Sequence, residues 1–347
     1  MRRTQGGLGR RTVGAIALAG VLTAALQVSA VAEPGPSSTL TEVHAELRRL
    51  YHDAEVATEK YNAADERLTR QRKRVRQLNA QVKAAEAKLA DLRTKAGAAA
   101  RAQYRSGGLP AEVQLVLSQD PDGALDAAST ARQAQRSTTN LITALSTVGQ
   151  RVRDWRSDAV AEVKRGEVNR RTLSTQRKRI EERIATAQRT ESRLAFQQRR
   201  ELVALEQEEA VKAQAKWVDA GHLRYVGTEA GPAGRRAIAF ATAQIGKPYV
   251  WGAEGPDAFD CSGLTSQAWR SAGVTIPRTS QEQWHRLKRV PIRGMRPGDL
   301  VIYFSDASHV GLYVGDGKII QAPRPGRNVY VSPVASMEIL GVVRPDA

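Results

Sequence analysis

The chain contains a single cysteine, Cys261, within the sequence Phe-Asp-Cys-Ser-Gly at 259–263. The residues that follow, 264–272, have the pattern of a helix, so the sequence predicts that Cys261 lies at a helix N-terminus. There the helix dipole and the unpaired backbone N–H groups favour the thiolate, which is the nucleophilic form of cysteine. We therefore expect a reactive thiol with a pKa below its ordinary value of about 8.5.

A cysteine nucleophile needs a base within hydrogen-bond reach and usually a third group that orients this base. His309 begins a predicted strand, and a cysteine on a helix that faces a histidine on a strand is the arrangement of papain-like sites. His309 is therefore the favoured base. His285 lies on a short predicted helix and is interpreted as a surface histidine. The other three histidines lie in helical or linker sequence and are poor candidates: His44, His52 and His222.

Gln321 is the residue expected to orient His309. The Gly-Asp-Gly sequence at 315–317 predicts a hairpin turn, which brings Gln321 close to His309 on the neighbouring strand. The side-chain amide of Gln321 can accept a hydrogen bond from the imidazole and so select its tautomer, but it has no charge with which to stabilise an imidazolium. The alternative is that Gln321 is simply a polar strand residue.

Residues 232–347 have the pattern of an α+β domain that is long enough to bury a core of its own. An amphipathic helix is predicted at 235–245, followed by the Cys261 helix and a shorter helix at 280–287. After Pro297-Gly298-Asp299 the pattern changes to that of strands. These strands are predicted at 300–304, 309–314, 318–321, 329–331 and 339–342. We expect the helix that bears Cys261 to pack on an antiparallel sheet.

A long all-α region, residues 33–216, precedes this domain. Between residues 40 and 104, apolar residues recur at alternating steps of three and four from Leu47 to Ala99, which is typical of a coiled coil. A break at about 105–123 predicts a cap, after which the helical pattern resumes. Two helices of similar length predict an antiparallel hairpin, with an extended dimeric coil as the alternative. The region is interpreted as a docking or regulatory arm, or as a spacer.

The first 32 residues resemble a secretory signal peptide. A basic start is followed by an apolar run at 15–26 and by Ala30-Val31-Ala32, which fits the small-residue cleavage rule. We therefore expect a secreted protein that begins at Glu33, with an uncleaved membrane anchor as the alternative. A single cysteine in an exported protein excludes an internal disulfide and favours a reactive thiol or an intermolecular link.

The glycine-rich segment 217–231 is predicted to be a linker between the helical region and the α+β domain. It contains apolar residues between Trp217 and Val226. One hypothesis is that these residues cover the active-site groove before activation. The alternatives are that they lie elsewhere on the domain or cover the end of the coil.

The formal net charge of +17 indicates either attraction to an anionic polymer or a solvated helical surface rich in arginine. Nothing in the sequence resembles a nucleic-acid-binding module, and aromatic residues, at 5%, are too sparse for base-stacking platforms. The sequence also contains no metal-ligand cluster and no phosphate-binding loop. We therefore expect neither a cofactor nor a nucleic-acid partner.

Five ordered blocks resemble the NlpC-type family of bacterial cell-wall cysteine peptidases, which have a papain-like fold. The long N-terminal coil resembles the coiled-coil members of that family, the PcsB-like and Rip-type hydrolases. The resemblance extends over about residues 235–343. The blocks are Gly-Lys-Pro-Tyr-Val-Trp-Gly at 246–252, Phe-Asp-Cys-Ser-Gly-Leu at 259–264, Pro-Arg-Thr-Ser at 277–280, Pro-Gly-Asp-Leu at 297–300 and Ser-His-Val-Gly-Leu-Tyr-Val-Gly at 308–315.

The resemblance implies an endopeptidase that cleaves peptidoglycan stem peptides between D-isoglutamate and a diamino acid, commonly diaminopimelate. It implies Cys261 as the nucleophile and His309 as the base. Gln321 takes the third position, where the family more often has His, Glu or Asn. The hydroxyl of Tyr249 and the backbone N–H of Cys261 are implied to hold the oxyanion. The residues implied to line the substrate groove are Asp260, Ser262 and Arg278.

Each groove residue also has a structural alternative, with Asp260 and Ser262 as helix-capping groups and Arg278 as a surface charge. The resemblance further implies that the coil engages a membrane complex of the FtsEX type. Two other functions stay open on the same fold: an amidase or transpeptidase, and an inactive adaptor that binds the wall. The presence of both Cys261 and His309 argues against the adaptor, whereas the uncharged Gln321 is its only support.

Overall fold

The computed structural model describes residues 39–105, 113, 121–224, 226–227 and 229–347 of the chain. The predicted signal peptide lies outside the described residues, as does most of the predicted cap at 105–123. Among the described residues no helix combines the length and the apolar character needed to cross a membrane.

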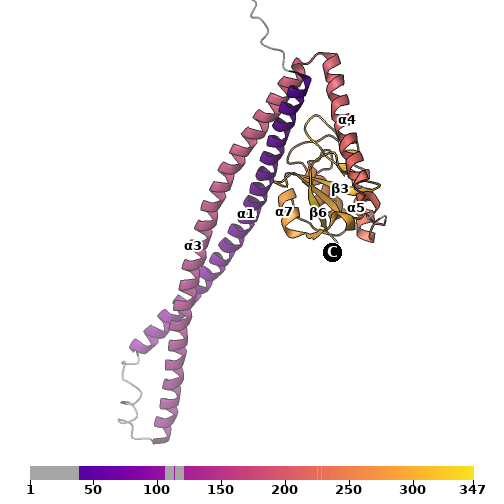
Figure 1. Cartoon of the computed structure of the whole chain (residues 1–347). Coiled ribbons are helices and arrows are strands. Elements are labelled where there is room, and N and C mark those ends of the chain that lie inside the picture. The colour runs from indigo at the N-terminus through magenta and orange to yellow at the C-terminus, as the bar shows by residue number, and fades with distance from the viewer. Residues whose placement is uncertain (1–38, 106–112, 114–120, 225, 228) are drawn as a thin grey trace, which may run out of the picture. The chain divides into compact units, whose positions relative to one another are not determined.

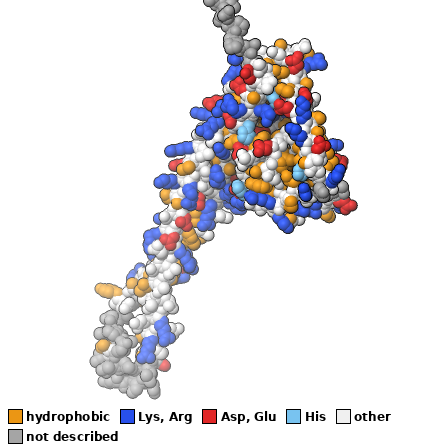
Figure 2. Space-filling view, in the orientation of Figure 1, with side chains coloured by type: hydrophobic (Ala, Val, Ile, Leu, Met, Phe, Trp, Pro, Cys, Tyr) orange, Lys and Arg blue, Asp and Glu red, His pale blue; other side chains and the backbone are white. Residues whose placement is uncertain are grey.

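Two long helices, α1 (Leu40–Arg105) and α3 (Pro121–Arg193), run antiparallel and side by side (Figure 1). Their register is visible where the side-chain amide of Asn169 donates to the amide oxygen of Gln71 at 2.8 Å. In this structure the two helices therefore pair as a hairpin within one chain. Lys and Arg side chains project from its surface into solvent (Figure 2).

The repeat of apolar residues explains why these helices pair. Alternating steps of three and four place these residues on one stripe of the helix, which the partner helix covers. Tyr61 belongs to the same stripe but is only partly buried, and its ring packs edge-on against Trp251 with centroids 5.2 Å apart. The buried members of the stripe on α1 include Leu47, Leu50, Ala54, Ala57, Ala64, Leu68, Leu78 and Leu92.

A break after Arg193 separates α3 from α4 (Phe196–Asp219), which leads into a short 3-10 helix at His222–Arg224. The predicted linker thus begins inside α4, since this helix continues through Trp217. Trp217 is buried in a cluster with Met295 and with residues of the sheet such as Val301 and Tyr303. The side chain of Gln214 also contacts the domain, because its amide nitrogen donates to the carbonyl oxygen of Gly317 at 3.2 Å.

The C-terminal domain combines three helices with a six-stranded sheet in the order β1-β6-β2-β3-β4-β5, and all paired strands are antiparallel. The predicted fold class is confirmed. The helices are α5 (Pro232–Thr242), α6 (Cys261–Ser271) and α7 (Ser280–Arg286). The strands are β1 (Lys288–Val290), β2 (Leu300–Tyr303), β3 (His309–Gly315), β4 (Lys318–Gln321), β5 (Tyr330–Pro333) and β6 (Ile339–Arg344).

Strand β1 was not predicted from the sequence. It is three residues long and lies at the edge of the sheet beside β6, with Lys288 and Arg289 exposed. So short a polar strand shows no alternation that a sequence pattern can detect. A 3-10 turn at Ile292–Gly294 then connects β1 to β2.

The main core of the domain lies between the helices and the sheet. Helix α6 packs against α5 and β3. Leu264 and Trp269 of α6 are fully buried against Leu312 of β3. This packing places the first turn of α6, which begins with Cys261, near the start of β3, which begins with His309. The site is therefore built from a helix N-terminus and a strand N-terminus.

Candidate active site

Helix α6 starts at Cys261, and the preceding Asp260 caps it by accepting a hydrogen bond from the Gly263 N–H at 2.6 Å. Gly263 is required because a Cβ there would lie 2.2 Å from the carbonyl oxygen of Ala253. The turn thus explains the Asp-Cys-Ser-Gly sequence. Cys261 itself is 2% exposed, and the sulfur lies at the positive end of the helix.

His309 and Gln321 meet across the β3–β4 hairpin, as the turn at Gly315 predicts. The imidazole Nε2 of His309 lies 2.7 Å from Oε1 of Gln321, and both side chains are buried. The amide nitrogen of Gln321 donates in turn to the hydroxyl of Ser332 on β5 at 2.6 Å. Ser332 was not predicted as a site residue, because one serine in a short strand has no distinguishing pattern.

Tyr249 lies beside the nucleophile loop, since a short parallel bridge joins it to Phe259. Its side chain is buried. Burial raises the pKa of Tyr249 well above its ordinary value, and the neighbouring Cys261 and Asp260 raise it further. The phenol therefore keeps its proton and can donate a hydrogen bond, which is what an oxyanion-binding group requires.

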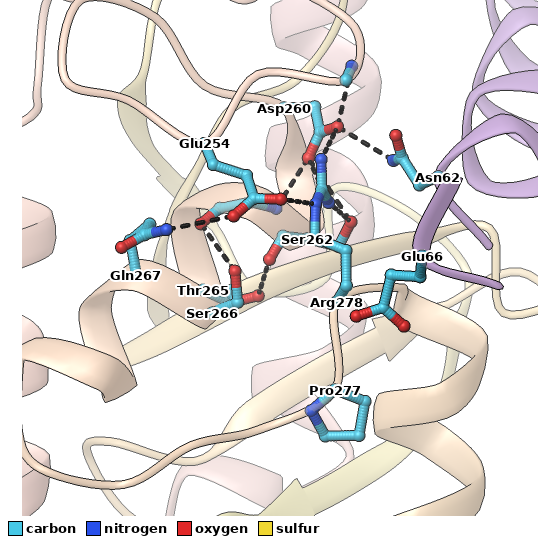
Figure 3. Close-up of polar contacts among 12 residues, drawn as sticks. Asn62, Glu66, Glu254, Asp260, Ser262, Thr265, Ser266, Gln267, Pro277 and Arg278 are labelled. Carbon is cyan, nitrogen blue, oxygen red and sulfur yellow. Dashed lines mark hydrogen bonds and ion pairs between the residues drawn. The ribbon is translucent and has the colours of Figure 1, made fainter. Parts of the chain in front are cut away.

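Arg278 lies under the nucleophile loop and is only 7% exposed, so the alternative of a surface charge was wrong (Figure 3). Its guanidinium donates to both carboxylate oxygens of Asp260, at 2.7 and 3.0 Å, and to Glu254 at 2.6 Å. It also donates to the hydroxyl of Ser262 at 2.7 Å. Asp260 consequently caps α6 and neutralises Arg278 at the same time.

Helix α1 enters this site through Glu59, which is buried. One carboxylate oxygen accepts a hydrogen bond from the hydroxyl of Ser262 at 2.7 Å and lies 3.8 Å from the sulfur of Cys261. The other accepts from the backbone N–H of Ser280 at 2.9 Å. A residue of the long N-terminal helix thus occupies the space in front of the nucleophile.

Two further residues of the same helix face contact the site. A carboxylate oxygen of Glu55 lies 3.3 Å from Nδ1 of His309. The side-chain amide of Asn62 donates to Asp260 at 3.0 Å (Figure 3). Positions 55, 59 and 62 are spaced by four and three, so they share one face of α1. Helix α1 therefore blocks both the nucleophile and its base.

Sequence reasoning missed Glu55, Glu59 and Asn62 because they lie beside the apolar stripe, where charged residues normally face solvent. No sequence signal separates them from the other polar residues of the coil.

Contacts of Arg324 hold helices α1, α3 and α4 against the domain. Arg324 donates to Glu191 at 3.2 Å and to Glu206 at 3.1 Å, and its guanidinium lies 4.1 Å from the ring centre of Tyr51.

The predicted low pKa of Cys261 was wrong for this arrangement. Burial raises the pKa of the thiol well above its ordinary value, and the carboxylates of Glu59, Asp260 and Glu55 raise it further. A helix dipole typically stabilises a charge by about 0.3–1 kcal/mol, which is less than the cost of burying a thiolate among carboxylates. The helix that blocks the site therefore also keeps the thiol protonated.

The contacts between α1 and the site also shift the pKa values of Glu59 and His309. Burial and the nearby Asp260 raise the pKa of Glu59 to about 7. Burial by itself would lower the pKa of His309, but Glu55, the hydrogen bond to Gln321 and Glu59 together outweigh it, and the net shift is upward. With α1 in place, Glu55 therefore favours the protonated form of His309, in which the ring cannot act as a base.

The hypothesis that the linker covers the groove is wrong for Trp217. Its ring packs in a cluster with Met295 and Tyr303, which is separate from the cluster that contains Cys261. The groups that cover Cys261 come from α1.

The described part of the chain contains no group of three or more His, Cys, Asp or Glu side chains that could hold a metal ion.

The geometry is that of a buried thiol at a helix N-terminus, an imidazole oriented by an amide, and a phenol beside the thiol. Residues 246–339, which contain all three, match the model of the NlpC/P60 family. This segment is an NlpC/P60 domain. The match covers the nucleophile loop, the Arg278 segment and strands β1 to β5, and leaves the long helices outside it.

Relatives of the NlpC/P60 domain are found among named proteins. A curated protein of Corynebacterium glutamicum strain R, named a probable endopeptidase, is 42% identical over 119 residues, or 34% of this chain and 56% of that protein. The probable endopeptidase p60 of Listeria monocytogenes is 46% identical over 91 residues, or 26% of this chain and 19% of that protein. The chain thus spans about half of the first relative and a fifth of the second.

Solved structures match the same region. The P60 domain of an antigen from Mycobacterium avium subspecies paratuberculosis is 33% identical, and the match covers 32% of this chain and 93% of that chain, with a TM-score of 0.31. A structure of the resuscitation promoting factor interacting protein RipA is 34% identical over 33% of this chain and 62% of that chain, with a TM-score of 0.31.

Proposed function

We propose that the chain is a secreted cell-wall hydrolase that cleaves peptidoglycan stem peptides at the bond between D-isoglutamate and a diamino acid. The observation that supports this most directly is the joint position of Cys261 and the His309–Gln321 pair inside an NlpC/P60 domain. The names of the relatives, which are endopeptidases, support the same reaction class. The signal-like sequence at residues 1–32 supports secretion to the wall.

The proposed reaction is nucleophilic catalysis in two steps. His309 takes the proton of Cys261, the resulting thiolate attacks the amide carbonyl, and the developing oxyanion is held by the backbone N–H of Cys261 and the hydroxyl of Tyr249. His309 then gives its proton to the leaving amine, which leaves a thioester on the cysteine. His309 next takes a proton from water, whose oxygen attacks the thioester and releases the acid and the thiol.

The contacts of Glu59 support an acidic substrate. Its carboxylate lies against the hydroxyl of Ser262 and the backbone N–H of Ser280, near Arg278. D-Isoglutamate is linked through its γ-carboxyl group and keeps a free α-carboxylate. When α1 leaves, that carboxylate can take the place of the Glu59 carboxylate on the same donors, which would fix the scissile bond beside Cys261.

We further propose that the long helices form the regulatory arm of this enzyme. With Glu55 on the base and Glu59 on the nucleophile, α1 excludes substrate, keeps the thiol protonated and favours the form of His309 that cannot take the thiol proton. Activation then requires that α1 move away from the site. A membrane complex of the FtsEX type that binds the helical arm is our proposal for the partner that moves it.

The test is digestion of purified peptidoglycan by the full chain, with mass analysis of the products. We expect little product from the wild-type chain, new termini at the isoglutamate–diamino acid bond from a Glu55→Ala/Glu59→Ala variant, and none when Cys261→Ala is added. Glu46→Ala, on an exposed position of the same helix, is the matched control and should behave as wild type.

Three outcomes would contradict parts of this proposal. Products cut at a different bond would indicate the amidase or transpeptidase reaction. Binding to the wall without products from the Glu55→Ala/Glu59→Ala variant would favour the inactive adaptor. Equal activity of that variant and the wild-type chain would refute the regulatory role of α1 while leaving the endopeptidase intact.

A further inference from the structure

The third member of the catalytic group is an amide, and an amide has two possible orientations. The oxygen and nitrogen of Gln321 are nearly identical in shape but opposite in hydrogen bonding. With Oε1 toward His309, as here at 2.7 Å, the imidazole Nε2 carries a proton, and in the neutral ring Nδ1 can act as a base once Glu55 has left it. With the NH₂ group toward His309, Nε2 must accept, so the proton of the neutral ring lies on Nδ1.

The flipped orientation also opposes the imidazolium form, in which both ring nitrogens of His309 are donors. An NH₂ group cannot accept either of these hydrogen bonds. Family members with a carboxylate at the third position do not meet this difficulty, because both carboxylate oxygens are acceptors. The use of Gln321 therefore requires a neighbouring group that selects one amide orientation.

Ser332 occupies the place of such a group. It pairs in register with Ile319, two residues before Gln321 on the neighbouring strand, so both side chains project from the same face of the sheet. Its buried hydroxyl accepts from the amide nitrogen of Gln321 at 2.6 Å, and the hydroxyl of Tyr330 lies 3.5 Å from the same nitrogen. The NH₂ group thus faces two hydroxyl oxygens.

A serine hydroxyl can rotate, so Ser332 selects an orientation only if its own proton is engaged elsewhere. Ser332 and Tyr330 lie two residues apart on the same face of β5, and both hydroxyls face the amide nitrogen of Gln321, so the serine proton can be given to the tyrosine oxygen. Tyr330 is 43% exposed, and its own proton can be given to solvent. The lone pair of Ser332 consequently remains directed toward the Gln321 nitrogen.

We propose that Ser332 is a positioning residue that holds the Gln321 oxygen toward His309 and thereby selects the tautomer and stabilises the protonated form of this histidine. Tyr330 supports it by accepting the serine proton. The chain of groups leads from the catalytic imidazole through Gln321 and Ser332 to the surface at Tyr330. The catalytic meaning of this chain rests on the proposed function, but the orientation of the imidazole does not.

The experiment measures the pKa and tautomer of His309 by ¹⁵N NMR in the full-length protein, which contains only five histidines. Ser332→Ala is expected to lower the pKa of His309 by about one unit, because the flipped amide disfavours the imidazolium. Ser332→Thr, which keeps the hydroxyl, should restore the wild-type value. This readout does not require hydrolysis, so it stays valid if the proposed function fails.

A second background separates orientation from simple packing. In Gln321→Glu both oxygens are acceptors, so adding Ser332→Ala should change the pKa of His309 by less than about 0.3 unit. An equal fall in both backgrounds, or a loss of thermal stability with an unchanged pKa, would overturn the positioning role. If Ser332→Ala does not fold, Tyr330→Phe at the exposed end should lower the pKa in the same direction, and no shift would refute the proposal.

Discussion

Replacing Glu59 by alanine should open the site and activate the single thiol of the chain. Glu59 is the residue of α1 nearest to Cys261, at 3.8 Å from the sulfur, and its carboxylate accepts hydrogen bonds from Ser262 and Ser280. Its removal weakens the docking of α1. It also removes a negative charge that raises the pKa of the thiol. Both effects increase the reactivity of Cys261.

The size of the effect follows from these contacts. A hydrogen bond to a charged group contributes about 1.5–3 kcal/mol, and Glu59 accepts two from Ser262 and Ser280. Taking the carboxylate out of water costs several kcal/mol and offsets much of that sum. A net contribution of about 1–2 kcal/mol to docking corresponds to a rise of about 5–30-fold in the population with an open site.

The assay is the rate of alkylation of Cys261 by iodoacetamide in the folded full-length chain. The label reports one position because the chain has one cysteine. We expect the Glu59→Ala rate to exceed the wild-type rate by about 5–30-fold, while Glu46→Ala leaves it unchanged. A Glu59→Ala chain that is folded but reacts at the wild-type rate would refute the conclusion that Glu59 restrains the thiol.

Three further perturbations test the site. Docking of α1 should weaken as the pH rises from about 4.5 to about 7, because burial and then Asp260 raise the pKa of Glu59 to about 7. The alkylation rate of Cys261 should therefore show an extra rise over this pH range in the wild type, and Glu59→Gln should lack it. Arg278→Ala should lower the free energy of unfolding in urea by about 3–5 kcal/mol, because Asp260 is left buried without its partner. Gly263→Ala, added to the Glu55→Ala/Glu59→Ala variant, should lower the thermal stability and the hydrolysis rate together, since its Cβ would lie 2.2 Å from the Ala253 carbonyl oxygen.

The catalytic core was predictable because its members are set by local structure. A helix N-terminus needs only the few residues around Cys261, and a tight hairpin brings His309 and Gln321 together across twelve residues. The apolar run at 300–304, the alternation at 309–314 and the turn signal at 315–317 likewise predicted strands, since such patterns are visible within a few positions. These features depend on contacts that are near in sequence.

The contact between Glu59 and Cys261 spans 202 positions, and no local pattern predicts it. A heptad repeat defines the stripe that the partner helix covers, but every polar face of the coil is equivalent until a third surface packs against it. The burial of Arg278 was hidden for the same reason, because an arginine in a loop is usually solvated.

The protonation and burial of Cys261 separate what the sequence determines from what the tertiary structure determines. The sequence by itself determined that the chain contains a cysteine at the start of a helix, with a histidine and an amide on a neighbouring hairpin. Only the tertiary structure decided that this thiol is protonated and covered, because a pKa depends on burial and on charges from every element that packs around the group. Two of those charges, Glu59 and Glu55, come from a helix that ends more than 150 residues before Cys261.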